Sequence, residues 1–149
     1  MEPKEQLAEV MKNTSLIALA SSVEDLPNVR IVDIYFDEKR NVVVFPTSAL
    51  SPKVKEFEAN DTVAFTTIPQ GPGPVVRVQN ATVSKSDWSI DEIKDTLIAH
   101  RPGFEMMLKG FGENVVVYEI SFAKALIAEK GQKTIVELYA TKLIFYHKS

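Results

Sequence analysis

Cysteine is absent from the 149-residue chain, which excludes disulfides, thiolate metal sites and a cysteine nucleophile. No apolar run is long enough to span a membrane. The N-terminal segment is polar and acidic and lacks the pattern of a signal peptide. The two histidines, His100 and His147, have no companions at metal-ligand spacing. These absences predict a cytoplasmic protein with no membrane partner and no metal site.

A surplus of basic residues is missing as well. The formal net charge is −3 and the pI is about 5.4, whereas nucleic-acid-binding proteins usually carry a basic face, so we expect no nucleic-acid partner. Glycine is scarce, and Gly71 and Gly73 alternate with prolines, which suits a rigid turn rather than a phosphate-binding loop. The length and the 45% hydrophobic content predict one domain over residues 1–149.

The patterning that is present predicts short strands and a few short helices. Helices are expected over 4–12, from Ser51 (as a capping serine before Pro52) to near Asn60, from the capping box at Ser89 to the breaker at 100–103, and over 104–109. Strands are expected over 14–20, 29–36, 42–45, 62–68, 75–83 and 115–120, with loops over 21–27 and 37–41. Residues 124–128 and 134–146 fit strand and helix equally.

Antiparallel hairpins dominate this order, and the regular alternation of strand and helix that makes a parallel sheet is missing. We therefore predict a mainly β (α+β) fold, an antiparallel split β-barrel of about six strands with short flanking helices. Closure of the sheet removes exposed edges, which favours a barrel.

Polar and cationic side chains gather in one part of the predicted barrel. Two strands and the start of the second helix carry Arg30, Thr47, Ser48, Ser51 and Lys53. Arginine supplies a fork of donors, lysine a point charge and a helix start a favourable dipole, so these groups could hold one phosphate. The alternative is structural: Arg30 pairs with Asp33 or Asp37, and Lys53 is a solvated helix residue.

The order of these segments resembles a known family. It is carried by Pro27-Asn28-Val29-Arg30-Ile31-Val32, Phe45-Pro46-Thr47, Ser51-Pro52-Lys53-Val54, Asn60-Asp61-Thr62-Val63-Ala64-Phe65 and Arg77-Val78-Gln79-Asn80-Ala81. Over roughly residues 10 to 122 the chain resembles the pyridoxamine 5′-phosphate oxidase-like FMN-binding split barrels, in particular the small general-stress and nitroimidazole-resistance-like members. The resemblance implies a homodimer with two FMN sites at the subunit interface.

The resemblance also assigns roles to residues of this chain. Arg30 and Lys53 would meet the FMN phosphate, with hydroxyl contacts from Thr47, Ser48 and Ser51. The backbone of Ile31, Val32 and Pro46 would line the isoalloxazine. Two further candidates have structural alternatives, an ion pair for Arg77 and a hydrophobic staple on the following helix for Trp88.

Some family features have no counterpart here. Asn80 stands where many members have glycine, Val75 or Val76 falls where the true oxidases use a glutamine near the flavin, and residues 140–149 lack their substrate-binding arginine and histidine. We therefore expect no pyridoxine phosphate oxidase activity.

The sequence thus predicts an FMN-dependent oxidoreductase of unknown substrate, with reduced nicotinamide as a candidate electron donor. Three alternatives stay open: a non-enzymatic flavin or haem carrier or sensor, with His100 or His147 as haem ligand; a deazaflavin-dependent reductase; and a structural dimer with an empty groove. A homodimer is also expected because the apolar segments 42–44 and 115–117 need cover.

Overall fold

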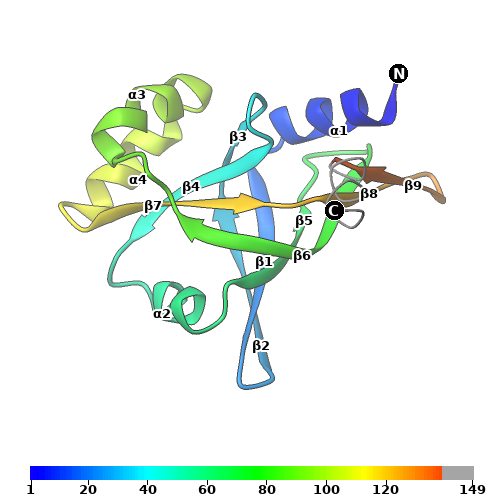
Figure 1. Cartoon of the computed structure of the whole chain (residues 1–149). Helices are drawn as coiled ribbons and strands as arrows, with labels where there is room; N and C mark the ends of the chain where they lie inside the picture. The colour runs from blue at the N-terminus through cyan, green and yellow to red at the C-terminus, as the bar shows by residue number, and fades with distance from the viewer. Residues whose placement is uncertain (139–149) are drawn as a thin grey trace, which may run out of the picture.

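The computed structural model describes residues 1–138, which form nine strands and four helices (Figure 1). The helices are α1 (Pro3–Lys12), α2 (Pro52–Ala59), α3 (Ile90–His100) and α4 (Gly103–Phe111). The strands are β1 (Leu16–Val23), β2 (Leu26–Asp33), β3 (Tyr35–Asp37), β4 (Val42–Ser48), β5 (Thr62–Thr67), β6 (Val75–Lys85), β7 (Val115–Ser121), β8 (Lys124–Glu129) and β9 (Gln132–Glu137). No helix of these residues is long and apolar enough to cross a membrane.

The strands form one antiparallel sheet in the order β2-β1-β5-β6-β7-β4-β3, with β8 and β9 attached to β6. The two ends of this order, β2 and β3, are consecutive in the chain and are separated only by Ile34. The predicted strand 29–36 is therefore bent in two, one half pairing with β1 and the other with β4. This bend curls the sheet into a half-barrel and confirms the predicted fold class, although the strands exceed the expected six.

The first hairpin differs from the prediction in a way that matters for the site. The predicted loop over 21–27 is wrong: β1 and β2 continue toward each other and leave a two-residue turn at Glu24 and Asp25. Both turn residues have positive φ, 52° and 65°, as the tight turns of twisted hairpins require. Ser21 consequently lies inside β1, paired with Asn28.

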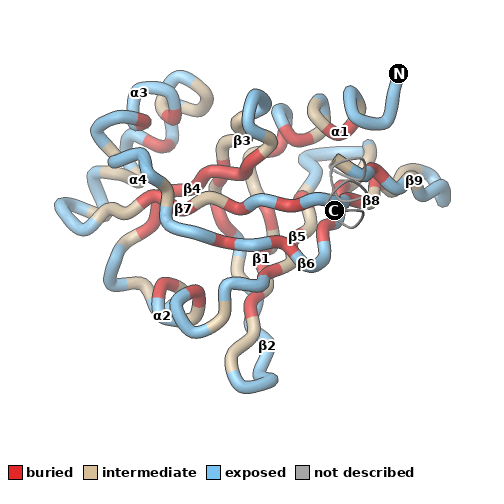
Figure 2. Tube along the Cα trace, in the orientation of Figure 1, coloured by how far each residue is buried: buried red, intermediate tan, exposed pale blue. Residues whose placement is uncertain are grey.

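Apolar side chains fill two clusters. The larger one lies inside the half-barrel and includes Ile17, Phe45, Phe65 and Ile120. The smaller one lies between the sheet and helices α3 and α4, and includes Val42, Val44, Val117, Ile93, Leu97 and Phe104. Because side chains alternate along a strand, β4 is buried on both faces (Figure 2).

This packing changes the argument for a dimer. Segment 42–44 was expected to need cover from a second chain, but its valines are buried within the chain. Val117 is buried with them, and Val115 and Val116 are half-buried. Segment 42–44 needs no second chain, because α3 and α4 cover Val42 and Val44 and the interior of the half-barrel covers Val43.

Helix and strand ends otherwise follow local signals. The capping box is confirmed, with Glu92 N–H donating to Ser89 Oγ and Ser89 N–H donating to Glu92 Oε1. Helix α4 ends at Phe111, before Gly112 (φ 63°), and so extends two residues beyond the expected range of 104–109. Residues 124–128 belong to β8 and residues 134–137 to β9, while the remainder of 134–146 beyond residue 138 lies outside the described residues.

Candidate functional site

Lys53 lies in the first turn of α2, and its ammonium group is held by hydroxyls. Lys53 Nζ donates to Thr47 Oγ1 at 2.8 Å and to Ser51 Oγ at 3.0 Å. Thr47 lies near the end of β4 and is only 3% exposed, so the barrel fixes the position of the hydroxyl that accepts from Lys53. Ser51 occupies the helix-capping position but makes no capping bond. The predicted position of the helix start is therefore confirmed, but the capping bond is not formed, and the Ser51 hydroxyl accepts from Lys53 instead.

Arg30 lies on β2 and bonds to the neighbouring strand and to α2. Its guanidinium donates to the Leu19 carbonyl oxygen at 3.2 Å, to Ser21 Oγ at 2.9 Å and to Glu56 Oε1 at 2.6 Å. These bonds engage three of the five N–H donors of an arginine. Two donors are left for a ligand.

The partner of Arg30 is not one that the sequence suggested. Asp33 pairs with Arg101 and Asp37 with Arg40, so both proposed pairings are wrong. Glu56, which the sequence analysis missed, accepts from Arg30 instead. Its position one helical turn after Lys53 was the available signal, because residues at i and i+3 share a helix face.

The group carries more positive than negative charge. Two cations, Arg30 and Lys53, face one carboxylate, Glu56. Burial lowers the pKa of Lys53, the positive charge of Arg30 lowers it further, and Glu56 opposes the shift. Within residues 1–138, Lys53 forms no ion pair with a carboxylate. A half-buried cluster with one uncompensated cation is chemically suited to bind an anion.

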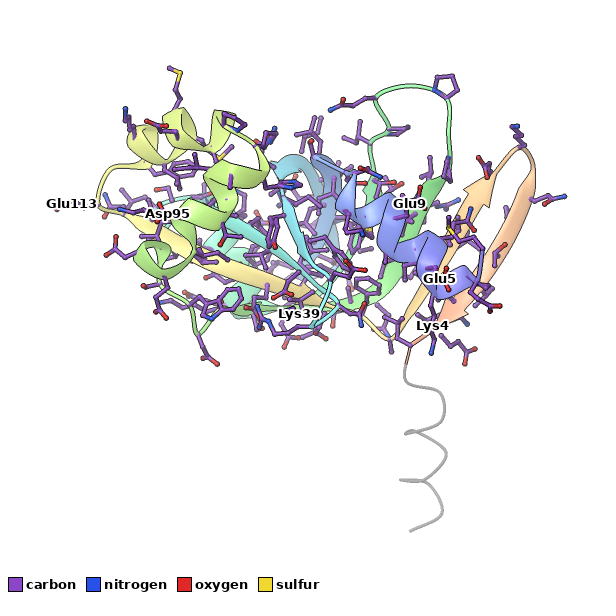
Figure 3. The ribbon with its side chains drawn as sticks, turned by 90° about the horizontal axis from the view of Figure 1, so that it is seen from above. Lys4, Glu5, Glu9, Lys39, Asp95 and Glu113 are labelled. Carbon is purple, nitrogen blue, oxygen red and sulfur yellow. The ribbon has the colours of Figure 1, made fainter. Side chains whose placement is uncertain are left out.

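The rest of the protein contrasts with this cluster. Acidic side chains such as Glu5, Glu9, Asp95 and Glu113 are exposed on the helices and on the loop before β7 (Figure 3). The net charge of −3 is therefore not a property of the groups around Lys53.

The remaining predicted residues near the cluster occupy different environments. Val32 and Pro46 are buried, while the Ile31 side chain is 65% exposed on the outer face of β2. Ser48 is half-buried and its hydroxyl accepts from the Leu50 N–H at 3.2 Å. Ser48 thus stabilises the turn before α2 rather than bonding to Lys53.

Arg77 and Trp88 are not joined to this cluster by any hydrogen bond or ion pair of the described chain. Arg77 is exposed on β6 beside a hollow of about 440 Å³ that Gln79 and Lys124 also line. Trp88 lies under the guanidinium of Arg40, 4.2 Å from its ring centre. Their roles as cofactor contacts stay predictions.

His100, one of the two candidate haem ligands, ends α3 and packs edge-on against Tyr35 with 5.2 Å between ring centres. Burial and the neighbouring charge of Arg101 lower its pKa, which favours the neutral imidazole. In the described part of the chain, no three or more histidine, cysteine, aspartate or glutamate side chains are grouped so that they could hold a metal ion. His147 lies outside the described residues.

These observations define a class: an antiparallel split barrel with a cationic, hydroxyl-lined cluster between β2, β4 and α2. The chain belongs to the pyridoxamine 5′-phosphate oxidase-like family, whose sequence profile matches residues 10–133. The resemblance found in the sequence is therefore confirmed. No curated protein sequence matches the chain.

Solved structures share the fold at low sequence identity. A structure titled putative pyridoxamine 5′-phosphate oxidase, from Listeria innocua, is 20% identical with a TM-score of 0.67, over 88% of this chain and 100% of the other. A NimC/NimA family protein of Clostridium acetobutylicum is 16% identical with a TM-score of 0.65, over 91% and 95%. A heme binding protein of Mycobacterium smegmatis is 12% identical with a TM-score of 0.74, over 94% of this chain and 60% of that one.

Proposed function

We propose that the chain binds FMN, with the phosphate at Arg30 and Lys53, and uses it in an oxidoreductase reaction. The observation that carries this proposal is the half-buried Lys53 ammonium, which within residues 1–138 bonds only to hydroxyls and lies near a second cation. A bound phosphate would supply the missing negative charge.

The residues present fit this group. A phosphate ester carries a charge of about −2 and strong acceptor oxygens, and the cluster offers Lys53, the free donors of Arg30 and the positive end of α2. The hydroxyls of Thr47 and Ser51 already fix the lysine, so little side-chain order has to be gained on binding. Ile31, Val32 and Pro46 would flank the flavin ring through their backbone, as the family resemblance implies.

FMN, when bound, would supply the electron or hydride chemistry, and the chain would supply position and charge. Reduced nicotinamide is our candidate donor, and we do not assign pyridoxine phosphate as substrate.

A homodimer forms part of the proposal, on a surface different from the one the sequence suggested. On β2, Val29 and Ile31 are 62% and 65% exposed, and Ile135 on β9 is 52% exposed. On this outer face, residues that are cross-strand partners of one another form a row across six strands. The row consists of Ile31, Ala18, Thr66, Arg77, Leu126 and Ile135. Small side chains in the row would let a second copy approach closely, and its burial would cover the exposed apolar groups.

The test is the absorption spectrum of freshly purified protein, followed by mass analysis of the extracted cofactor. We expect flavin bands and the mass of FMN. A deazaflavin mass would assign the chain to the deazaflavin-dependent reductases. A colourless protein that does not take up added FMN would contradict the proposal and favour a structural dimer.

A haem carrier is the second candidate. His100 lines a hollow of about 770 Å³ with Tyr35, Arg40 and Trp88, and the fold is shared with a heme binding protein. A Soret band that disappears in His100→Ala, with no flavin bands, would support this candidate over FMN.

A further inference from the structure

Glu56 accepts hydrogen bonds from three side chains at the cationic cluster. Its Oε1 accepts from Ser21 Oγ at 2.5 Å and from Arg30 Nη2 at 2.6 Å, and its Oε2 accepts from Asn28 Nδ2 at 3.3 Å. One helical side chain thereby joins α2 to both strands of the first hairpin. The side chains of Arg30 and Glu56 are only 18% and 21% exposed, so the pair is largely shielded from solvent.

Two like charges in one cluster favour separation unless a carboxylate offsets one of them. Arg30 and Lys53 are like charges, and after burial the charge of Arg30 is the second cause of the lowered pKa of Lys53. An arginine side chain has several rotatable bonds and gains entropy by swinging into solvent. Glu56 opposes both the repulsion and the movement of Arg30 into solvent, because its carboxylate offsets one positive charge and accepts a hydrogen bond from the guanidinium.

We propose that Glu56 is a positioning residue for phosphate: it holds the Arg30 guanidinium beside the Lys53 ammonium and so gives the cluster its preference for phosphate-bearing ligands. The proposal rests on the proposed function for the identity of the ligand. Lys53 and the group that holds Arg30 are both carried by α2, three residues apart, so the position of this helix sets both halves of the site.

Glu56→Gln separates the positioning role from two simpler roles, which are to lower the positive charge of the cluster or to support the helix. Glu58→Gln is the control. Glu58 is exposed on the same helix, so its substitution makes the same charge change without touching Arg30. The dissociation constants of FMN and riboflavin are measured for wild type and both variants by fluorescence quenching.

We expect Glu56→Gln to reduce the preference for FMN over riboflavin roughly tenfold, about the effect of one charge-assisted hydrogen bond, and Glu58→Gln to leave it unchanged. Tighter FMN binding in Glu56→Gln would mean that Glu56 only lowers the positive charge, and would overturn the proposal. An equal loss for both flavins would mean that Glu56 only supports the helix, and would overturn it too.

A second measurement needs no flavin. In the NMR spectrum of the ligand-free wild type we expect slowed guanidinium exchange for Arg30, and titration with inorganic phosphate should shift the Arg30 signal. In Glu56→Gln both features should be lost, while amide signals elsewhere stay in place. If the wild-type protein does not distinguish FMN from riboflavin, the proposed function fails. The Arg30 signals test the role of Glu56 independently of that result, because unchanged signals in Glu56→Gln would refute the proposal that Glu56 positions Arg30.

Discussion

Arg30 and Arg40 show how the same side chain serves two purposes in one small protein. Arg40 donates to Asp37 at 2.8 Å and to both oxygens of Glu119 at 3.2 and 2.9 Å, and it stacks on Trp88. Arg30 shares a single carboxylate with a nearby lysine. One cluster therefore has a surplus of negative charge and the other a surplus of positive charge.

The difference indicates which arginine is structural. The Arg40 guanidinium donates its three hydrogen bonds to two carboxylates, which offset its charge and tie the β3–β4 turn to β7. The Arg30 guanidinium also donates three hydrogen bonds, but only one of them goes to a carboxylate, and the nearby lysine has no carboxylate partner in residues 1–138. A phosphate would complete the second cluster and has no place in the first.

The largest effect is expected for Lys53→Ala. Removal of this ammonium leaves a bound phosphate with one cationic partner, so FMN affinity should fall by roughly 2–5 kcal/mol. Calorimetric titration measures the loss, with Lys55→Ala as the matched control because Lys55 is exposed on the same helix. Equal losses in the two variants would place the phosphate elsewhere.

The two faces of β2 should also differ. Ile31→Asp puts a charge on the outer face of β2, opposite the face of Arg30. In the proposed dimer Ile31 would be buried, and loss of a buried apolar side chain costs roughly 1.5–3 kcal/mol. The variant should therefore be monomeric at protein concentrations at which the wild type is dimeric. Sedimentation equilibrium tests this against Met106→Asp on α4, where Met106 is 80% exposed. A dimer unaffected by Ile31→Asp would show that another surface forms the interface.

Arg40→Ala tests the arginine to which we assign a structural role. Because the Arg40 side chain is 41% exposed, solvent screens its ion pairs, and we expect a loss of only about 1 kcal/mol in the free energy of unfolding. FMN affinity should not change. The comparison fails if Arg40→Ala weakens FMN binding as much as Lys53→Ala does.

The smallest effect is the pH dependence that Lys53 confers. Its pKa is lowered by burial and by Arg30 from the usual 10.5, so the lysine loses its proton at a lower pH in the folded protein than in the unfolded chain. As pH rises through the lowered pKa, ligand-free stability should increase because the unfolded chain then binds more protons, whereas FMN affinity should decrease. In Lys53→Met, neither the free energy of unfolding nor the FMN affinity should show this change at alkaline pH. A wild-type protein whose ligand-free stability falls, or whose FMN affinity rises, over this pH range would contradict the environment assigned to Lys53.

The sequence predicted the barrel because local signals agreed with it. The alternating apolar residues of 62–67 and 75–83, the capping box at Ser89 and the polar turn at 37–41 each act within a few residues of the chain. The tight turn at Glu24 and Asp25 was missed because neither residue is a glycine. Strand β4 looked like a surface in need of a partner because a run of valines does not reveal which helices cover it.

Some contacts among the candidate site residues could be predicted from the sequence, and others could not. Lys53, Thr47 and Ser51 are near in sequence and were correctly brought together. Arg30 was paired with nearby aspartates, but its partner Glu56 arrives from a different element. Similarly, Glu119 reaches Arg40 from β7. Pairings between distant segments depend on how strands register, which no short motif encodes.

The central claim is that Arg30 and Lys53 recognise a phosphate, and a competition between FMN and riboflavin tests it most directly. Both flavins carry the same ring, so the ratio of their dissociation constants isolates the phosphate. We predict that wild-type protein binds FMN at least a hundredfold more tightly, about 3 kcal/mol, and that Lys53→Ala removes most of this preference. Equal affinities of wild-type protein for the two flavins would contradict the account.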